Sequence, residues 1–138
     1  MIPTIDWMQQ SFTTYNNLYF GGKLPTPRFE VSKNCIVNGQ EVWGYYDLKA
    51  NFSYVTRRIT KVHDIGVICL TSKYTRSEAD VIGTLLHEMI HEYIYLVLGI
   101  YPVLKHGIIF QQIAKRIESD GWDVTSNDKK NTDQEVFV

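Results

Sequence analysis

The sequence has few cysteines and almost no imbalance of charge. Its two cysteines, Cys35 and Cys69, lie far apart and form no CxxC motif. Two such thiols cannot build a zinc ribbon or a disulfide framework, so we expect both to be reduced. Fourteen basic residues stand against fifteen acidic ones, which gives a net charge of −1. This balance excludes a strong overall basic field that would attract nucleic acid.

Long hydrophobic runs and an export signal are also missing. The longest apolar run, residues 93–104, is too short to span a bilayer and is interrupted by Gly99 and Pro102. The N-terminus has no basic stretch followed by an apolar one, which a signal peptide requires. We therefore expect a cytoplasmic protein without a membrane segment.

What is present fits one folded domain with an N-terminal helix and a small sheet. The chain has 138 residues, of which 44% are apolar and 21% are charged, and this length supports a hydrophobic core. Apolar residues at helical spacing predict a first helix over residues 5–19, and a Gly-Gly pair ends it. Residues 57–64 are expected to form a polar, mostly basic connection. Short strands are expected at residues 28–35, 42–46, 52–55 and 65–71.

Two further helices are expected in the second half of the chain. Ser77 is a good N-cap for a helix over residues 78–98, which Gly99 would end. Gly83 lies inside that helix, and close packing against a neighbouring segment would explain it. A third helix is expected at residues 104–119.

The order of these elements predicts an α+β fold. We expect a small, mainly antiparallel sheet of three or four strands beside the helices. The domain should cover residues 1–122, and residues 123–138 should form a polar, flexible tail.

The chemistry of the sequence is concentrated in an H-E-x-x-H motif on the second predicted helix. His87 and His91 are four residues apart, so their imidazoles project from one face of a helix and can bind one zinc ion. Glu88 lies at the edge of that face, where it can act as a general base without binding the metal. Zinc lowers the pKa of a bound water to about 7 and polarises a carbonyl. The pattern indicates hydrolysis of amides or esters.

A catalytic zinc site needs a third protein ligand, and two residues compete for this role. His106 follows the turn around Pro102 and opens the third predicted helix, which can bring it back beside the first two histidines. Phe110 lies one turn later and should pack under the site. Glu118, near the end of that helix, is the alternative ligand. We favour His106.

These motifs resemble the SprT-like family of zinc metalloproteases. The resemblance rests on H-E-M-I-H at 87–91, H-G-x-x-F at 106–110 and Y-N-x-x-Y-F-G-G-K-L-P at 15–25. It covers about residues 5–122, and it implies a minimal zincin-like fold. It also implies one catalytic Zn²⁺ ion bound by His87, His91 and His106, with Glu88 as the catalytic base.

The resemblance further implies a polypeptide substrate. The best-known members, the Spartan-type proteases, digest proteins crosslinked to DNA and carry an additional zinc-binding module. No cysteine or histidine follows Gly121 in this sequence, so proteolysis carries over more directly than DNA binding does. Arg57, Arg58 and Lys61, close to His63, are the residues that would contact DNA if it is bound.

Two other functions remain open at this point. A zinc amidohydrolase of the deformylase type would use Cys69, on the strand before the metal helix, as its third ligand. A non-catalytic zinc-containing module that binds protein or DNA would need no general base, and the intact Glu88 argues against it.

Two features of the substrate site can also be anticipated. Tyr45, Tyr46 and Tyr101 are candidates, by residue type alone, for stabilising an oxyanion. The strand at residues 65–71 could pair with an extended peptide if it lies at a sheet edge.

Overall fold

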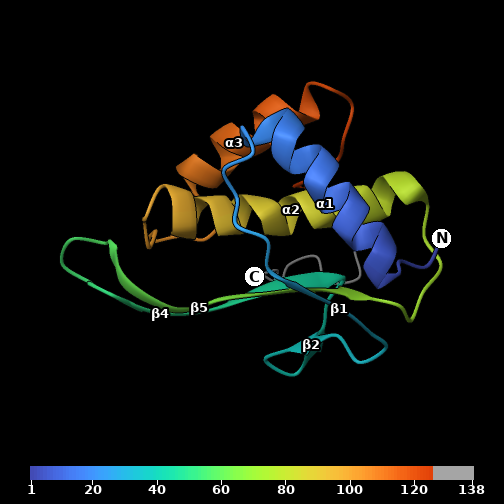
Figure 1. Ribbon diagram of the computed structural model, residues 1–138, viewed down its shortest axis with the longest axis horizontal. Coiled ribbons are helices and arrows are strands. Elements are labelled where there is room, and N and C mark those ends of the chain that lie inside the picture. Colours follow the sequence, from blue (N-terminus) through green and yellow to red (C-terminus); the bar gives the residue numbers. More distant parts are fainter. Residues whose placement is uncertain (126–138) are drawn as a thin grey trace.

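The computed structural model describes residues 1–125 of the chain. Figure 1 shows three helices on one face of a small sheet, and the predicted α+β class is confirmed. In chain order, the elements are α1 Ile5–Tyr19, β1 Arg28–Ser32, β2 Ile36–Val37, β3 Gln40–Glu41, β4 Gly44–Phe52, β5 Ile59–Thr71, α2 Glu78–Glu92, a π-helix η1 Tyr93–Val97, and α3 Ile108–Glu118.

The main sheet has the strand order β1-β5-β4. Strand β4 pairs antiparallel with β5, whereas β1 pairs parallel with it, so the sheet is mixed. Strands β2 and β3 form a separate small hairpin. Because β5 is the central strand, residues 65–71 do not lie at a sheet edge, and the condition for a peptide to pair with them is not met. Within residues 1–125, β4 is an edge strand of this sheet.

The hairpin of β4 and β5 is longer than the sequence pattern indicated. The predicted strands at 42–46 and 52–55 are largely one strand, β4, and most of the predicted connection at 57–64 belongs to β5. The first half of β5 is mostly exposed and polar, and only its second half is buried. An apolar run therefore marks only the covered half of a strand that extends beyond the core.

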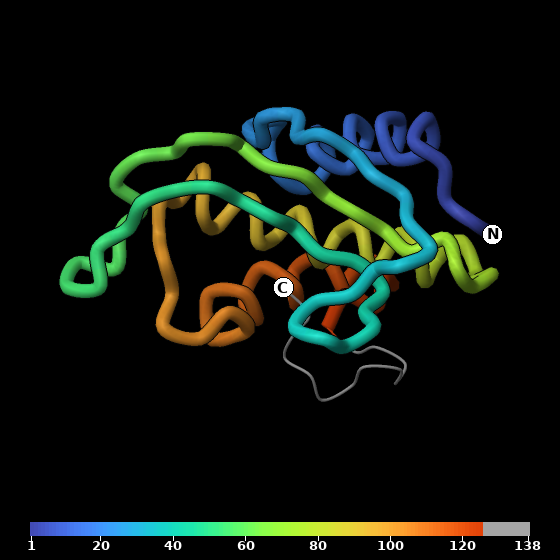
Figure 2. Tube along the Cα trace, turned by 90° about the horizontal axis from the view of Figure 1, so that it is seen from below, coloured from blue at the N-terminus to red at the C-terminus, as the bar shows by residue number. Residues whose placement is uncertain are grey.

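Helix α2 lies at the centre of the fold. It packs against α1, α3, β4 and β5, and Figure 2 shows α1 and α3 on opposite sides of it. Every residue from Val81 to Glu92 is buried. The apolar core around it includes Met8, Phe12, Ile68, Leu85, Leu86, Met89, Ile90, Phe110 and Ile117.

The ends of α2 explain how the following chain returns to it. Ser77 caps the helix, because its hydroxyl accepts a hydrogen bond from the Asp80 amide at 3.1 Å. The predicted continuation to residue 98 is the π-helix η1, after which Gly99 adopts a left-handed φ of 69°. Helix α3 begins at Ile108, later than predicted, since residues 100–107 first form a bridge, bends and turns around Pro102.

Gly83 allows the chain after α3 to cross α2 closely. A Cβ atom at this position would lie 2.2 Å from the backbone oxygen of Asp123, which confirms the predicted close packing. The crossing places Val124 in the core, where it is 3% exposed. The predicted boundary at residue 122 stays a prediction, and residues 126–138 of the predicted tail lie outside the described residues. Among the helices of the described chain, none is long and apolar enough to cross a membrane.

Candidate metal centre

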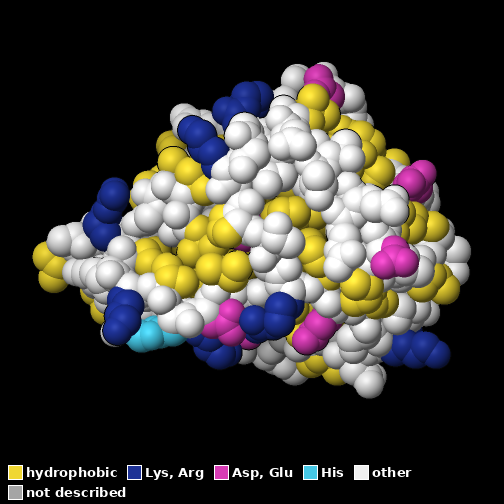
Figure 3. Space-filling view, in the orientation of Figure 1, with side chains coloured by type: hydrophobic (Ala, Val, Ile, Leu, Met, Phe, Trp, Pro, Cys, Tyr) yellow, Lys and Arg dark blue, Asp and Glu magenta, His cyan; other side chains and the backbone are white. Residues whose placement is uncertain are grey.

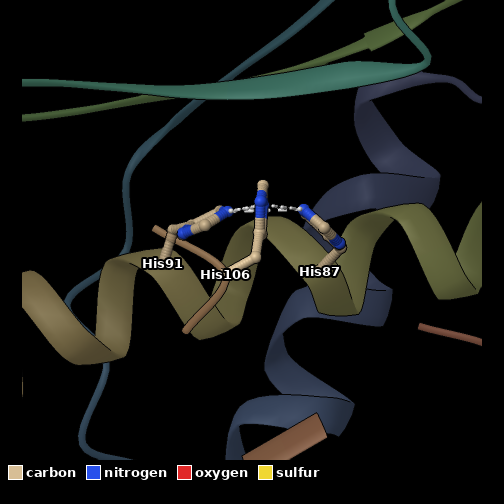
Figure 4. Close-up of side chains that lie close together, drawn as sticks. All are labelled: His87, His91 and His106. Atoms are coloured by element: carbon tan, nitrogen blue, oxygen red, sulfur yellow. Dashed lines mark hydrogen bonds between the residues drawn. The ribbon is translucent and has the colours of Figure 1, made fainter. Parts of the chain in front are cut away.

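Three histidines converge on one point above α2. His87 and His91 project from successive turns of the helix, and His106 comes from the segment just before α3. Their Nε2 atoms are 3.1 Å apart for His87 and His106, 3.2 Å for His91 and His106, and 3.3 Å for His87 and His91. Figure 4 shows the three rings meeting at these nitrogens. In residues 1–125 they form the group of side chains that could hold a metal ion.

The spacing of these nitrogens fits a metal ion with tetrahedral coordination. Ligands at 2.0–2.1 Å from a tetrahedral zinc ion lie roughly 3.3 Å from one another. Phe110 packs against all three rings, with centroids 4.8 Å from His87 and 4.9 Å from both His91 and His106. The predicted position of Phe110 under the site is thus confirmed. This apolar support holds the rings together on the side away from the shared point.

A backbone carbonyl orients the first histidine. Nδ1 of His87 lies 2.9 Å from the carbonyl oxygen of Val124, so in the neutral ring it is this nitrogen that donates its proton. The Nε2 lone pair then points at the shared centre, as a metal ligand requires. Burial and the neighbouring His87 and His106 hold the pKa of His91 well below its usual range, which keeps its ring neutral as well.

Glu88 is buried beside this centre. It is completely inaccessible to solvent, and neither carboxylate oxygen has a hydrogen-bond partner of normal geometry in the described chain. Burial raises the pKa of Glu88 well above its usual range, while the charge of Lys105 and the backbone amide of Tyr46 act in the opposite direction. A carboxylate left without partners in the core is costly unless a ligand or cation completes its surroundings.

Two residues near the centre were not predicted from the sequence. Tyr95 lies one turn after His91 and stacks on it, with ring centroids 6.4 Å apart. Burial, together with the charges of Tyr101 and Glu88, raises the pKa of Tyr95 to about 12. Lys105 directly precedes His106, and its charge acts on Glu88. The i, i+4 spacing from His91 could have indicated Tyr95, whereas no local signal indicates Lys105.

The structure separates the other candidate ligands from the histidines. Oε2 of Glu118 accepts hydrogen bonds from the amides of Val124 and Thr125 at 2.8 and 3.0 Å, so Glu118 fixes the segment that orients His87. Cys69 lies in a small apolar cluster with Cys35. His63 lies on β5 rather than in a connection, with its Nε2 atom 2.6 Å from Oδ1 of Asn51.

The three tyrosines suggested for oxyanion binding are engaged elsewhere. The Tyr46 hydroxyl donates to the carbonyl oxygen of Ile65. Tyr45 packs against the cysteine cluster, and Tyr101 stacks on Phe52 with centroids 3.7 Å apart. Tyr46 is thus held by a hydrogen bond, and Tyr45 and Tyr101 by packing contacts.

A buried helix with an H-E-x-x-H motif and a third histidine from the next segment form a candidate metal centre. The model of the SprT-like family matches residues 8–131. Since this match covers most of the 138 residues, the chain belongs to the SprT-like family. No curated protein matches this sequence.

Proposed function

We propose that this protein is a zinc-dependent metalloprotease that hydrolyses peptide bonds in polypeptide substrates. The observation that carries the proposal is the convergence of three imidazole nitrogens within 3.1–3.3 Å beside a buried, unpartnered glutamate. The donor set suits zinc, because three histidines and a water are a typical ligand set of catalytic zinc sites. His87, His91 and His106 would hold the ion. Membership of the SprT-like family supports the same function.

The residues of the chain divide the chemistry among them. When bound, zinc would polarise the carbonyl group of the substrate and make water a good nucleophile at neutral pH. Glu88 takes the proton of the attacking water and passes it to the leaving amine. One carboxylate suits both steps, because the group that accepts the proton as a base can then donate it as an acid. The Val124 carbonyl keeps His87 in the tautomer that leaves Nε2 unprotonated.

Strand β4 is the element on which a peptide substrate would lie. It is an edge strand of the main sheet within the described residues, and it packs beside α2. The backbone amide of Tyr46, on this strand, acts on the Glu88 carboxylate, which places the strand next to the catalytic group. A peptide that pairs with the β4 edge would be bound through its backbone, so recognition would tolerate many sequences.

The surface gives little reason to assign DNA as an obligatory partner. On the face shown in Figure 3, the basic side chains lie mostly on the left and the acidic ones mostly on the right, and the basic groups are separated from one another rather than joined in a continuous strip. Arg57, one of the three predicted DNA contacts, donates hydrogen bonds to the carbonyl oxygens of Tyr101 and Pro102. Whether DNA affects the activity is tested by measuring cleavage with and without it.

The decisive experiment measures zinc content and proteolysis together. The purified chain, loaded with zinc, is incubated with unfolded casein, with and without single-stranded DNA, and cleavage is followed by mass spectrometry. We expect one zinc per chain and peptide release. We expect Glu88→Gln to retain zinc and to lose roughly 10²–10⁴-fold in rate, because it keeps the shape of the side chain but not its basicity.

Each outcome has a defined meaning. Cleavage that persists at wild-type rate in Glu88→Gln would contradict the proposed mechanism. Stoichiometric zinc without cleavage in either condition would favour a non-catalytic zinc-containing binding module instead. Absence of zinc binding after reloading would contradict the metal centre itself.

A further inference from the structure

A cavity that the proposed chemistry does not use opens beside the metal centre. It has a volume of about 280 Å³ and lies between β4 and the segment that follows α2. Figure 2 shows the backbone of the segment after α2, which leaves the end of that helix near the outer part of the β4–β5 hairpin and leads to α3. Tyr46 and Tyr95 line the cavity, and Tyr95 also stacks on His91 with centroids 6.4 Å apart. The cavity therefore lies next to the site, with Tyr95 shared between them.

Four of the nine residues that line the cavity are aromatic, and one small residue leaves space between them. Along β4, the lining residues are Tyr46, Asp47, Leu48, Ala50 and Phe52, of which the exposed Asp47 is the one charged residue. Tyr101 closes the opposite side and stacks on Phe52 at an interplanar angle of 24°. Ala50, set between larger neighbours, leaves room for a guest side chain.

The cavity is held open by backbone pairing on its outer side. The amide of Ile59 donates to the Gly99 carbonyl and the amide of Tyr101 donates to the Arg57 carbonyl, each at 2.9 Å. The Arg57 guanidinium also binds the carbonyl oxygens of Tyr101 and Pro102, at 3.0 and 2.9 Å. These bonds join the turn of the hairpin to the segment after η1. A pocket preformed in this way does not have to be ordered by its ligand.

We propose that this cavity is a specificity pocket that takes one aromatic side chain of the peptide substrate, close to the cleaved bond. The inference rests on the proposed protease function and names its preferred substrates. The volume lies below the roughly 300–1,000 Å³ typical of sites for small molecules, and it suits a single large side chain. Tyrosine and phenylalanine walls favour an aromatic guest through offset and edge contacts.

Two neighbours of the pocket support this assignment. Lys105 lines the cavity, where its ammonium group can approach the face of a bound ring. A peptide paired with the β4 edge presents alternate side chains to the same face of the strand, so one of them reaches the pocket. The backbone of β4 thus gives affinity for many sequences, and the pocket selects among them.

The test maps the sites at which the zinc-loaded protein cleaves unfolded casein. We expect Phe, Tyr and Trp to be enriched about tenfold at one position near the cleaved bond. Ala50→Leu fills the cavity, so it should abolish this enrichment while cleavage at other sites continues. Asn51→Leu adds similar bulk to the outward face of the same strand and should keep the preference. If Ala50→Leu does not fold, Ala50→Val should reduce the enrichment partway.

A second readout separates this inference from the protease proposal. The Glu88→Gln variant is titrated, by fluorescence anisotropy, with two labelled alanine-rich peptides, one with a central Phe and one with a central Ala. Tighter binding of the Phe peptide, lost in the Glu88→Gln, Ala50→Leu double variant, supports the pocket even if the wild type cleaves nothing. Cleavage without an aromatic preference, or a preference that Ala50→Leu leaves intact, overturns the pocket but not the protease.

Discussion

The metal centre and the aromatic pocket lie side by side on α2 and β4 but are built in different ways. Two of the three histidines lie one helical turn apart, so their approach follows from the geometry of a single helix. The pocket instead needs β4 and the segment after η1, which are far apart in the chain and meet through the hairpin turn. A local pattern can specify the first arrangement, whereas the second depends on tertiary packing.

The polar residues of the two regions also differ in how they are satisfied. Around the metal centre, Glu88 and Glu92 are both fully buried, and none of their carboxylate oxygens has a hydrogen-bond partner in residues 1–125. At the pocket, Arg57 is fully engaged with two carbonyl groups and with the ring of Tyr101. The buried carboxylates near the metal centre therefore lower the stability of the fold, whereas the hydrogen bonds of Arg57 beside the pocket add to it.

The largest expected effect is on the metal centre. We expect His106→Ala to lose stoichiometric zinc, because only two ligands remain on α2. Cys69→Ser should keep one zinc per chain, since Cys69 lies in the cluster with Cys35 and is not in the group of described side chains that could hold a metal ion. Elemental analysis of the purified variants measures both. The reverse pattern would identify Cys69 as the third ligand and support a site of the deformylase type.

A substitution one turn before His87 on α2 should weaken the same centre indirectly. Gly83→Ala places a Cβ atom 2.2 Å from the Asp123 carbonyl oxygen, so the chain there must move. The Val124 carbonyl then no longer orients His87, and zinc affinity should fall by roughly 10–100-fold. Competition with a chelating dye measures the affinity. An unchanged affinity, in a protein that remains folded, would show that the Val124 contact does not orient the ligand.

The stability of the metal-free protein should decrease as the pH rises. Burial raises the pKa of Glu92 to about 9, far above the value of about 4.3 in an unfolded chain. Between these values the native state holds a proton that the unfolded state releases, so the contribution is complete below the lower pKa and is lost as pH approaches the upper one. From pH 5.5 to 8 the loss should be up to about 3 kcal/mol.

Glu92→Gln isolates this contribution, because it keeps the volume and removes the titrating group. Urea unfolding in the presence of a chelator should show the variant more stable than the wild type at pH 8 and similar to it at pH 5.5. Glu88 titrates in both proteins, so its effect cancels in the difference. Parallel pH profiles for the two proteins would contradict a buried, protonated Glu92.

The smallest effect is expected at the turn that closes the pocket. Arg57→Ala removes two hydrogen bonds to the segment after η1 and a cation–π contact, with the guanidinium carbon 4.7 Å from the Tyr101 ring centroid. We expect a loss of about 1–2 kcal/mol in unfolding free energy. The rate of amide hydrogen exchange should rise in residues 99–102, and the zinc content should not change. Loss of zinc in this variant would mean that the two regions are coupled.

Several parts of the molecule were predictable because their signals are local. The capped start of α2, the ring of Phe110 under the histidines and the close approach at Gly83 all follow from residue type and helical spacing. The early end of α2 was not predictable in this way. Residues 93–97 keep an apolar helical pattern while their backbone widens into a π-helix, and side-chain periodicity does not report that change.

The sequence by itself determined the α+β class, the helix with the H-E-x-x-H motif, and the three histidines that could hold a metal ion. Spacing along one helix and the choice of zinc-binding side chains carry that information without any long-range contact. Only the tertiary structure decided that β5 is central and β4 is an edge, that Val124 orients His87, and that Ala50 opens an aromatic pocket. Strand order and pocket shape depend on contacts between distant segments, which a one-dimensional pattern does not encode.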